Sequence, residues 1–141
     1  MVKTYDAKQV VLTWGGIQLS GFPEGSFINI VKSADNVTRK VGADGHVSRS
    51  LNADKTYDIT ITLEGTSVSN DYISGVRILD DATGKGVLPF LMTDLSGSTV
   101  FFAESMWVSK DADVDLSNEI SENAWAFQTG QVDEYNIGGN A

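Results

Sequence analysis

The chain has 141 residues, of which 41% are hydrophobic, so we expect a single domain with a real core, spanning residues 1–141. It carries 10 basic and 19 acidic side chains, a formal charge of −9, and an acidic surface repels nucleic acid. The absence of cysteine excludes disulfides, thiolate metal sites and cysteine nucleophiles. The sequence begins without a signal-peptide pattern and contains no apolar run of the roughly 20 residues that a membrane helix needs. We therefore expect a soluble protein, made in the cytoplasm, with no membrane partner.

The first third of the chain is predicted to form short strands. Residues 9–14 read as a strand that ends at Gly15-Gly16, and residues 17–19 continue it after a bulge or turn. Residues 20–26 contain Gly21, Pro23 and Gly25 and have turn chemistry. Residues 27–31 are the next expected strand.

A polar hairpin follows. Residues 37–41 and 46–51 alternate around Asp44-Gly45, which is a strong hairpin signal. This segment carries Arg39, Lys40, His46 and Arg49 and has little apolar surface. It cannot bury much within its own domain, so we expect it to project.

Residues 56–63 give the clearest strand pattern. Tyr57, Ile59, Ile61 and Leu63 alternate with Thr56, Asp58, Thr60 and Thr62. The apolar face is predicted to be core. The polar face is predicted to meet water or another polar surface.

One helix is expected between residues 69 and 83, with Ser69 as its N-cap and Asp71 in its first turn. Gly84 is the natural residue to end it. Gly75 is costly inside a helix, which suggests close packing there. One apolar stripe joins Tyr72, Ile73, Val76 and Leu79.

A second, apolar hairpin is predicted from residues 86–95 and 98–108 around Ser96-Gly97. Both strands are apolar on both faces, which indicates burial on two sides, within the domain or by a neighbouring subunit. Pro89 marks an edge or a bulge. An acidic loop over residues 110–123 and a late strand over residues 124–128 complete the chain. The fold class is mainly β: a β-sandwich or partial barrel with one packed helix.

No catalytic or cofactor site is predicted. Asp111, Asp113, Asp115 and Glu122 have the spacing of a calcium loop, but Leu116 replaces the required glycine, so a solvated acidic loop is the better interpretation. His46 is the single histidine and has no nucleophile or carboxylate cluster near it in the sequence, so a surface histidine is favoured over a catalytic or metal-binding one.

Two further patterns have ordinary explanations. Gly84-Lys85-Gly86 follows the helix, whereas a phosphate-binding loop precedes one. The tryptophans at positions 14, 107 and 125 could line a sugar platform, but they lie in apolar strands and are better explained by core or interface packing.

The order of several motifs resembles that of the tube proteins of contractile phage tails, a fold shared with tailocin and type VI secretion tubes. The motifs are the strand YDITITLE, the helix start SNDYIS, the turn TGKG, the strands LPFLMTD and FFAESMW around Gly97-Ser98-Thr99, and the late strand Trp125-Ala126-Phe127. The order and spacing of these motifs together carry the resemblance, which covers most of the chain. An acidic KDADVDLS replaces the family's Pro-rich turn after the Trp strand.

The resemblance implies a structural, non-enzymatic virion protein with a tail-tube-like fold. It implies homohexameric rings stacked into an inner tail tube, through which the genome passes without specific binding. The implied partners are the tail sheath, the tape measure protein, the baseplate and the tail terminator. On this basis Asp58, Thr60 and Thr62 are candidates for the lumen wall. The candidate inter-subunit or inter-ring hairpin residues are Arg39, Lys40, Asp44, Gly45, His46 and Arg49.

Two alternatives stay open from the sequence. One is a tailocin or type VI secretion-like tube, which shares the architecture and differs in cargo. The other is a monomeric β-sandwich module that binds carbohydrate through its tryptophans.

Overall fold

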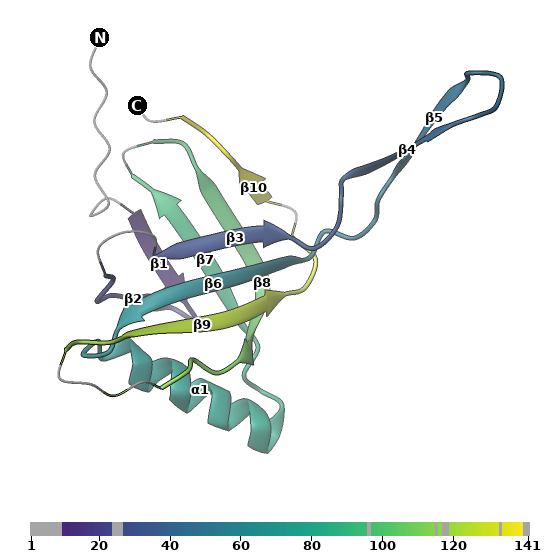
Figure 1. Ribbon diagram of the computed structural model, residues 1–141. Helices are drawn as coiled ribbons and strands as arrows, with labels where there is room; N and C mark the ends of the chain where they lie inside the picture. The colour runs from purple at the N-terminus through teal and green to yellow at the C-terminus, as the bar shows by residue number, and fades with distance from the viewer. Residues whose placement is uncertain are drawn as a thin grey trace, which may run out of the picture.

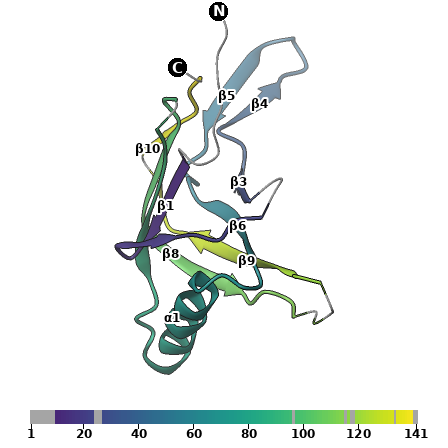
Figure 2. The ribbon, with the colours of Figure 1, turned by 90° about the vertical axis from the view of Figure 1, so that its left-hand side faces the viewer.

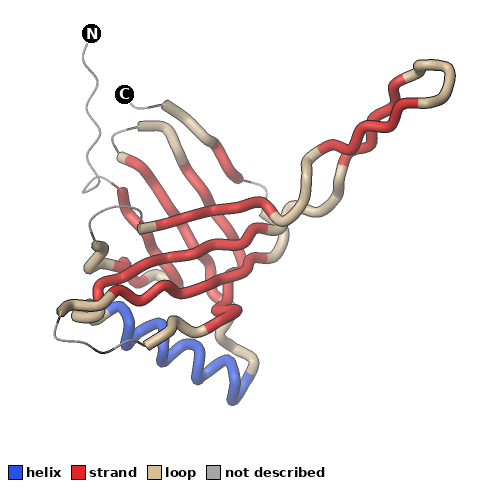
Figure 3. Tube along the Cα trace, in the orientation of Figure 1, coloured by secondary structure: helices blue, strands red, loops and turns tan. Residues whose placement is uncertain are grey.

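The computed structural model describes residues 10–23, 27–95, 97–114, 116, 119–132 and 134–139. Within them, strands dominate and a single helix is present (Figure 3). The strands are β1 (Val10–Trp14), β2 (Ile17–Leu19), β3 (Ile28–Lys32), β4 (Val37–Val41), β5 (Val47–Leu51), β6 (Tyr57–Glu64), β7 (Leu88–Asp94), β8 (Val100–Lys110), β9 (Glu122–Thr129) and β10 (Glu134–Asn136). The helix α1 runs over Ser69–Thr83.

One antiparallel sheet, in the order β2-β1-β7-β8-β9-β6-β3, folds over on itself. Figure 1 shows β3, β6 and β9 crossing in front of β1, β7 and β8, and the side view in Figure 2 separates these two layers. Strand β8 belongs to both layers. Its first half pairs with β7 and β10, and its second half pairs with β9.

The core fills the space between the layers. Ile59, Ile61 and Leu63 of β6 are buried, as the alternation predicted. Across the core lie the fully buried side chains of β1, β7 and β8, including Trp14, Phe90 and Phe101. Edge-to-face ring contacts join Trp14 to Phe127 and to Tyr72.

The helix lies along the open end of the two layers (Figure 2). Ile73 and Val76 are buried, and Gly84 ends the helix with φ of 70°, both as predicted. Three expectations were wrong. Val68, not Ser69, is the N-cap, because the buried Ser69 hydroxyl accepts the Ser20 amide instead. Leu79 is exposed, and a methyl group at Gly75 would meet nothing within 4 Å.

Strand β7 is buried on one face only, so the domain itself does not cover both faces, and cover by a neighbouring subunit stays a prediction. Phe90 and Met92 point into the core, whereas Pro89 and Leu91 are exposed. The register shift between β7 and β8 falls between Leu88 and Phe90, which confirms the bulge at Pro89.

Several boundaries differ from the expectation by one or two residues. Strands β3 and β6 each begin and end one residue later than predicted, and β9 is longer at both ends than residues 124–128. Strand β10 had no signal in the sequence.

Candidate assembly surfaces

The hairpin β4–β5 stands clear of both layers (Figure 1). Its turn is closed by the Gly42 amide, which donates to the His46 carbonyl over 2.8 Å, and Gly45 has φ of 86°. Every residue of both strands is exposed. The expectation of a projecting polar hairpin is therefore confirmed.

The root of the hairpin is held by short polar contacts. Asp54 accepts hydrogen bonds from the Thr56 amide and hydroxyl, at 3.0 and 2.6 Å. These bonds lower the pKa of the Asp54 carboxyl, the side-chain bond contributing most. The Lys55 carbonyl accepts the Val132 amide. The root is thus tied to the body of the protein.

One face of the hairpin combines aliphatic and cationic side chains. Cross-strand partners share a face, and the pairs on this face are Val37 with Leu51, Arg39 with Arg49, and Val41 with Val47. We call these six residues the hairpin face. Lys40 lies on the opposite face, opposite Ser48. Thus Arg39 and Arg49 come together, and Lys40 does not join them.

The outer face of β6 and β9 contains the three candidate lumen residues. Asp58, Thr60 and Thr62 lie opposite Gln128, Ala126 and Ala124, pointing away from the core. Asp58 also lines a cavity of about 390 Å³ near the hairpin root, together with Tyr57 and the half-buried Trp107. The side chains along the middle of this face are short, and those contributed by β6 are polar.

This outer face ends in a pair of glutamates that was not foreseen. Glu64 lies directly opposite Glu122 in the register of β6 and β9. No ion pair among the described residues uses either carboxylate. This pair could not be predicted from local sequence patterns, because the pairing of β6 with β9 joins segments far apart in the chain.

A partly apolar strip lies on the outer face of β7 and β8. Leu91 is opposite Phe102, and Thr93 is opposite Val100. Leu91 is exposed, and Phe102 and Val100 are half-buried. Among the described residues nothing covers this strip, so it is a second candidate contact surface.

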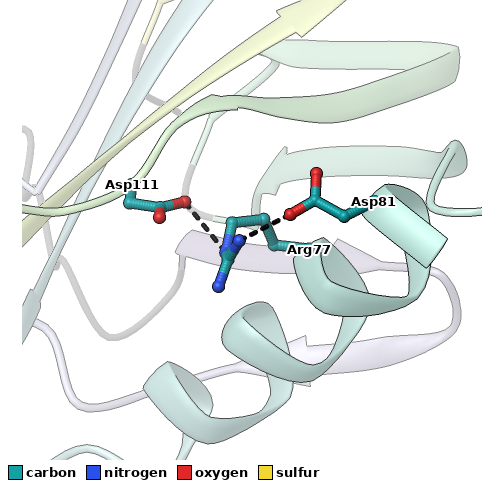
Figure 4. Close-up of polar contacts among 3 residues, drawn as sticks. All are labelled: Arg77, Asp81 and Asp111. Atoms are coloured by element: carbon teal, nitrogen blue, oxygen red, sulfur yellow. Dashed lines mark hydrogen bonds and ion pairs between the residues drawn. The ribbon is translucent and has the colours of Figure 1, made fainter.

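The acidic loop after β8 is tied to the helix. Arg77 contacts Asp81 at 2.8 Å and Asp111 at 3.0 Å, as Figure 4 shows. Asp115, part of the calcium-loop pattern, lies outside the described residues. The residues that are described contain no group of three or more side chains suited to hold a metal ion.

The positions of His46 and of the three tryptophans restrict the sites that these side chains can form. His46 lies at the hairpin tip, exposed, with Nε2 3.5 Å from Asp44 Oδ2, which confirms a surface histidine. Trp14 and Trp125 are buried, as predicted, and only Trp107 is partly exposed. A sugar platform of three tryptophans is therefore not available.

In the part of the chain that the structure describes, no helix has the length and apolarity to span a membrane.

Comparison with known proteins gives consistent matches. Structural protein ORF10 of Pseudomonas phage KPP10 is 28% identical over 111 residues, which is 77% of this chain, and the chain spans only 64% of that relative's length. The cap that terminates the tube of the anti-feeding prophage superposes with a TM-score of 0.58 at 13% identity, covering 100% of this chain and 94% of that one. A chain of the sheath–tube complex of an extracellular contractile injection system, PVC, superposes with a TM-score of 0.58 at 10% identity, covering 98% of this chain and 93% of that one.

These structural likenesses establish the fold, which is the tail-tube-like, mainly β fold expected from the sequence. The family described as bacteriophage PhiTE tail tube protein matches residues 14–137, from the end of β1 to just beyond β10. The match includes both layers, the hairpin and the helix. The chain belongs to the bacteriophage PhiTE tail tube protein family.

Proposed function

We propose that this chain, as a single domain over residues 1–141, assembles into homohexameric rings that stack to form the inner tube of a contractile phage tail. The observation that carries the proposal is the exposed hairpin on a chain of tail tube family. A two-stranded hairpin is marginally stable alone, and ordered contacts with other copies would stabilise it. Its role in this proposal is structural and non-enzymatic.

Uncovered surfaces support ring closure. Strand β3 is the last strand of its layer, and within the described part of the chain no further strand pairs with its outer edge. The Leu91–Phe102 strip is also uncovered within the described chain. Head-to-tail contacts of one copy with the next cover such surfaces and close into a ring when the rotation allows it.

The lumen wall is assigned to Asp58, Thr60 and Thr62 on the outer face of β6. A wall of short polar side chains with an acidic residue offers DNA no cationic grip, so the genome passes without specific binding. The tape measure protein occupies the same channel before ejection.

The other partners follow from the place of a tube in a tail. The tail sheath surrounds it, the baseplate joins one end and the tail terminator ends it. The solved structures of similar fold include a sheath–tube complex and a sheath/tube terminator, which supports the sheath and the terminator as partners. The protein resides in the virion tail after assembly in the host cytoplasm.

Electron microscopy of the purified protein and of a variant lacking residues 40–49, closed by a two-residue turn, tests the proposal. The wild type should form rings and tubes, and the variant should form rings that do not stack. Tubes of normal length from the variant would refute an inter-ring hairpin. A wild type that stays monomeric at high concentration would refute the tube itself.

A tube of a tailocin or type VI secretion-like particle is the second candidate, because the similar solved structures come from contractile injection particles. The two differ in cargo. Nuclease-resistant DNA inside purified particles identifies a phage tail, and its absence identifies an injection particle.

A further inference from the structure

The hairpin face is positively charged on an acidic protein. Residues 37–51 contain three basic and one acidic side chains, whereas the rest of the chain contains seven basic and 18 acidic ones. Arg39 and Arg49 are direct cross-strand neighbours, and like charges in this position destabilise a hairpin. None of the ion pairs among the described residues involves either arginine. Among the described residues, the hairpin face therefore has no counter-charge paired with its arginines.

The Glu64–Glu122 pair has the opposite charge and the same arrangement. The two carboxylates are also direct cross-strand neighbours. Exposed aliphatic residues lie within a few positions of them in the sequence: Val68, which is 74% exposed, and Ile120, which is 68% exposed. The hairpin face likewise has exposed aliphatic residues, Val41, Val47 and Leu51, on either side of its arginines.

The two surfaces lie at opposite ends of one strand. The hairpin leaves the body just before β6 begins at Tyr57, and β6 ends at Glu64 (Figure 1). A hairpin therefore cannot reach the glutamates of its own chain. It can reach those of a second copy placed end to end in the same orientation, which is the heterologous arrangement that generates a stack.

We propose that the hairpin face of one copy docks on the Glu64–Glu122 end of a second copy in the adjacent ring, with Arg39 and Arg49 paired to the two glutamates. This inference rests on the proposed tube. Guanidinium and carboxylate groups form charge-assisted, often bidentate hydrogen bonds. Docking relieves both like-charge pairs at once and covers the flanking aliphatic residues. It also gives every ring the same polarity along the tube.

Charge reversal tests the pairing. R39E/R49E and E64K/E122K should each leave rings intact and abolish stacking, and the four substitutions combined in one chain should restore tubes. R39E alone should shorten tubes, whereas its matched control K40E, on the opposite hairpin face, should not. Thermal melts followed by circular dichroism verify that each variant folds. If E64K/E122K does not fold, the single variant E122K, changed at an exposed position, replaces it in the stacking assay. Normal tubes from R39E/R49E and E122K would overturn the pairing while leaving the tube proposal intact.

Cross-linking gives a second readout, because the chain contains no cysteine. R49C/E122C treated with a short bismaleimide should give a ladder of oligomers on a denaturing gel. R49C or E122C alone can give at most dimers. The control K40C/E122C should give a much weaker ladder than R49C/E122C. An R49C/E122C sample that yields no species beyond dimers, under conditions where the wild type forms tubes, would overturn the inference.

Discussion

Tyr72 on the helix donates a hydrogen bond of 2.8 Å to the main-chain carbonyl of Trp14 at the end of β1, 58 residues earlier in the chain. The two rings also meet edge to face, with centroids 5.8 Å apart. The helix is thereby fixed to the first strand by one polar and one aromatic contact.

The substitution Y72F should remove this hydrogen bond and keep the ring contact. A half-buried hydrogen bond of this kind contributes about 1 kcal/mol, so the free energy of unfolding should fall by about that amount in urea titrations. Unchanged stability would show that water replaces the bond at no cost.

The same variant has a pH signature. Burial raises the pKa of Tyr72 above its ordinary value of 10.0. The stability linked to this neutral hydroxyl is present below pH 10 and is lost as pH rises through the folded-state pKa. Stability curves of Y72F should therefore fall less steeply in alkali than those of the wild type. Burial also raises the pKa of Tyr57, so part of the fall in stability with rising pH should remain in Y72F.

The substitution G75A should stabilise the protein by about 1 kcal/mol, because alanine is the better helix former and the site is open. Thermal and urea unfolding would measure the gain. G86A is a matched control: its methyl carbon would lie 2.3 Å from Asp80 Cβ, so it should destabilise. A loss of stability in G75A would indicate that the exposed helix surface is altered in some other way.

The substitution D54N should flatten the acid side of the stability curve. The hydrogen bonds from Thr56 lower the pKa of Asp54 below 3.8. The associated stability is present above pH 3.8 and is lost as pH falls through the folded-state pKa. Acid titrations followed by circular dichroism would show the difference. T56V, which removes only the hydroxyl donor, should give an intermediate curve, and a D54N curve parallel to the wild type would contradict the assignment.

The substitution N70A should destabilise the junction between β6 and the helix. Asn70 accepts the Trp125 indole N–H at 2.9 Å and donates to the carbonyls of Glu64 and Ser67. Losing these partners leaves the largely buried indole N–H without its acceptor, at a cost of about 1–3 kcal/mol. Urea titrations followed by tryptophan fluorescence would measure it. A fluorescence spectrum and midpoint identical to the wild type would contradict this role.

Local patterns were sufficient for most elements. The period of two in residues 56–63 predicted which side chains of β6 are buried, and Asp44-Gly45 predicted the turn of the hairpin, because both depend on chain neighbours alone. The helix cap could not be predicted in the same way. Ser69 has the right chemistry for an N-cap, but a tertiary contact with Ser20 takes its hydroxyl.

The candidate contact surfaces were harder to predict from the sequence than the strands and the helix. Arg39 and Arg49 were identified, with Lys40, as the basic residues of a polar hairpin, and the structure shows that only the two arginines are cross-strand neighbours. Glu64 and Glu122 were not identified, because their pairing depends on the order of strands in the sheet. The apolar content of residues 88–94 suggested burial on two sides, whereas the structure buries Phe90 and leaves Leu91 exposed. An apolar strand covered only after assembly gives the same sequence pattern as one buried in a monomer.

Strand β8 pairs with β7 and β10 through its first half and with β9 through its second. The two layers are therefore joined by an unbroken stretch of backbone as well as by side-chain packing. A mechanical load that acts on one layer would pass to the other along covalent bonds. Shearing the layers apart would require breaking ladder hydrogen bonds on both sides of β8, so the subunit should respond to such a load as one stiff body.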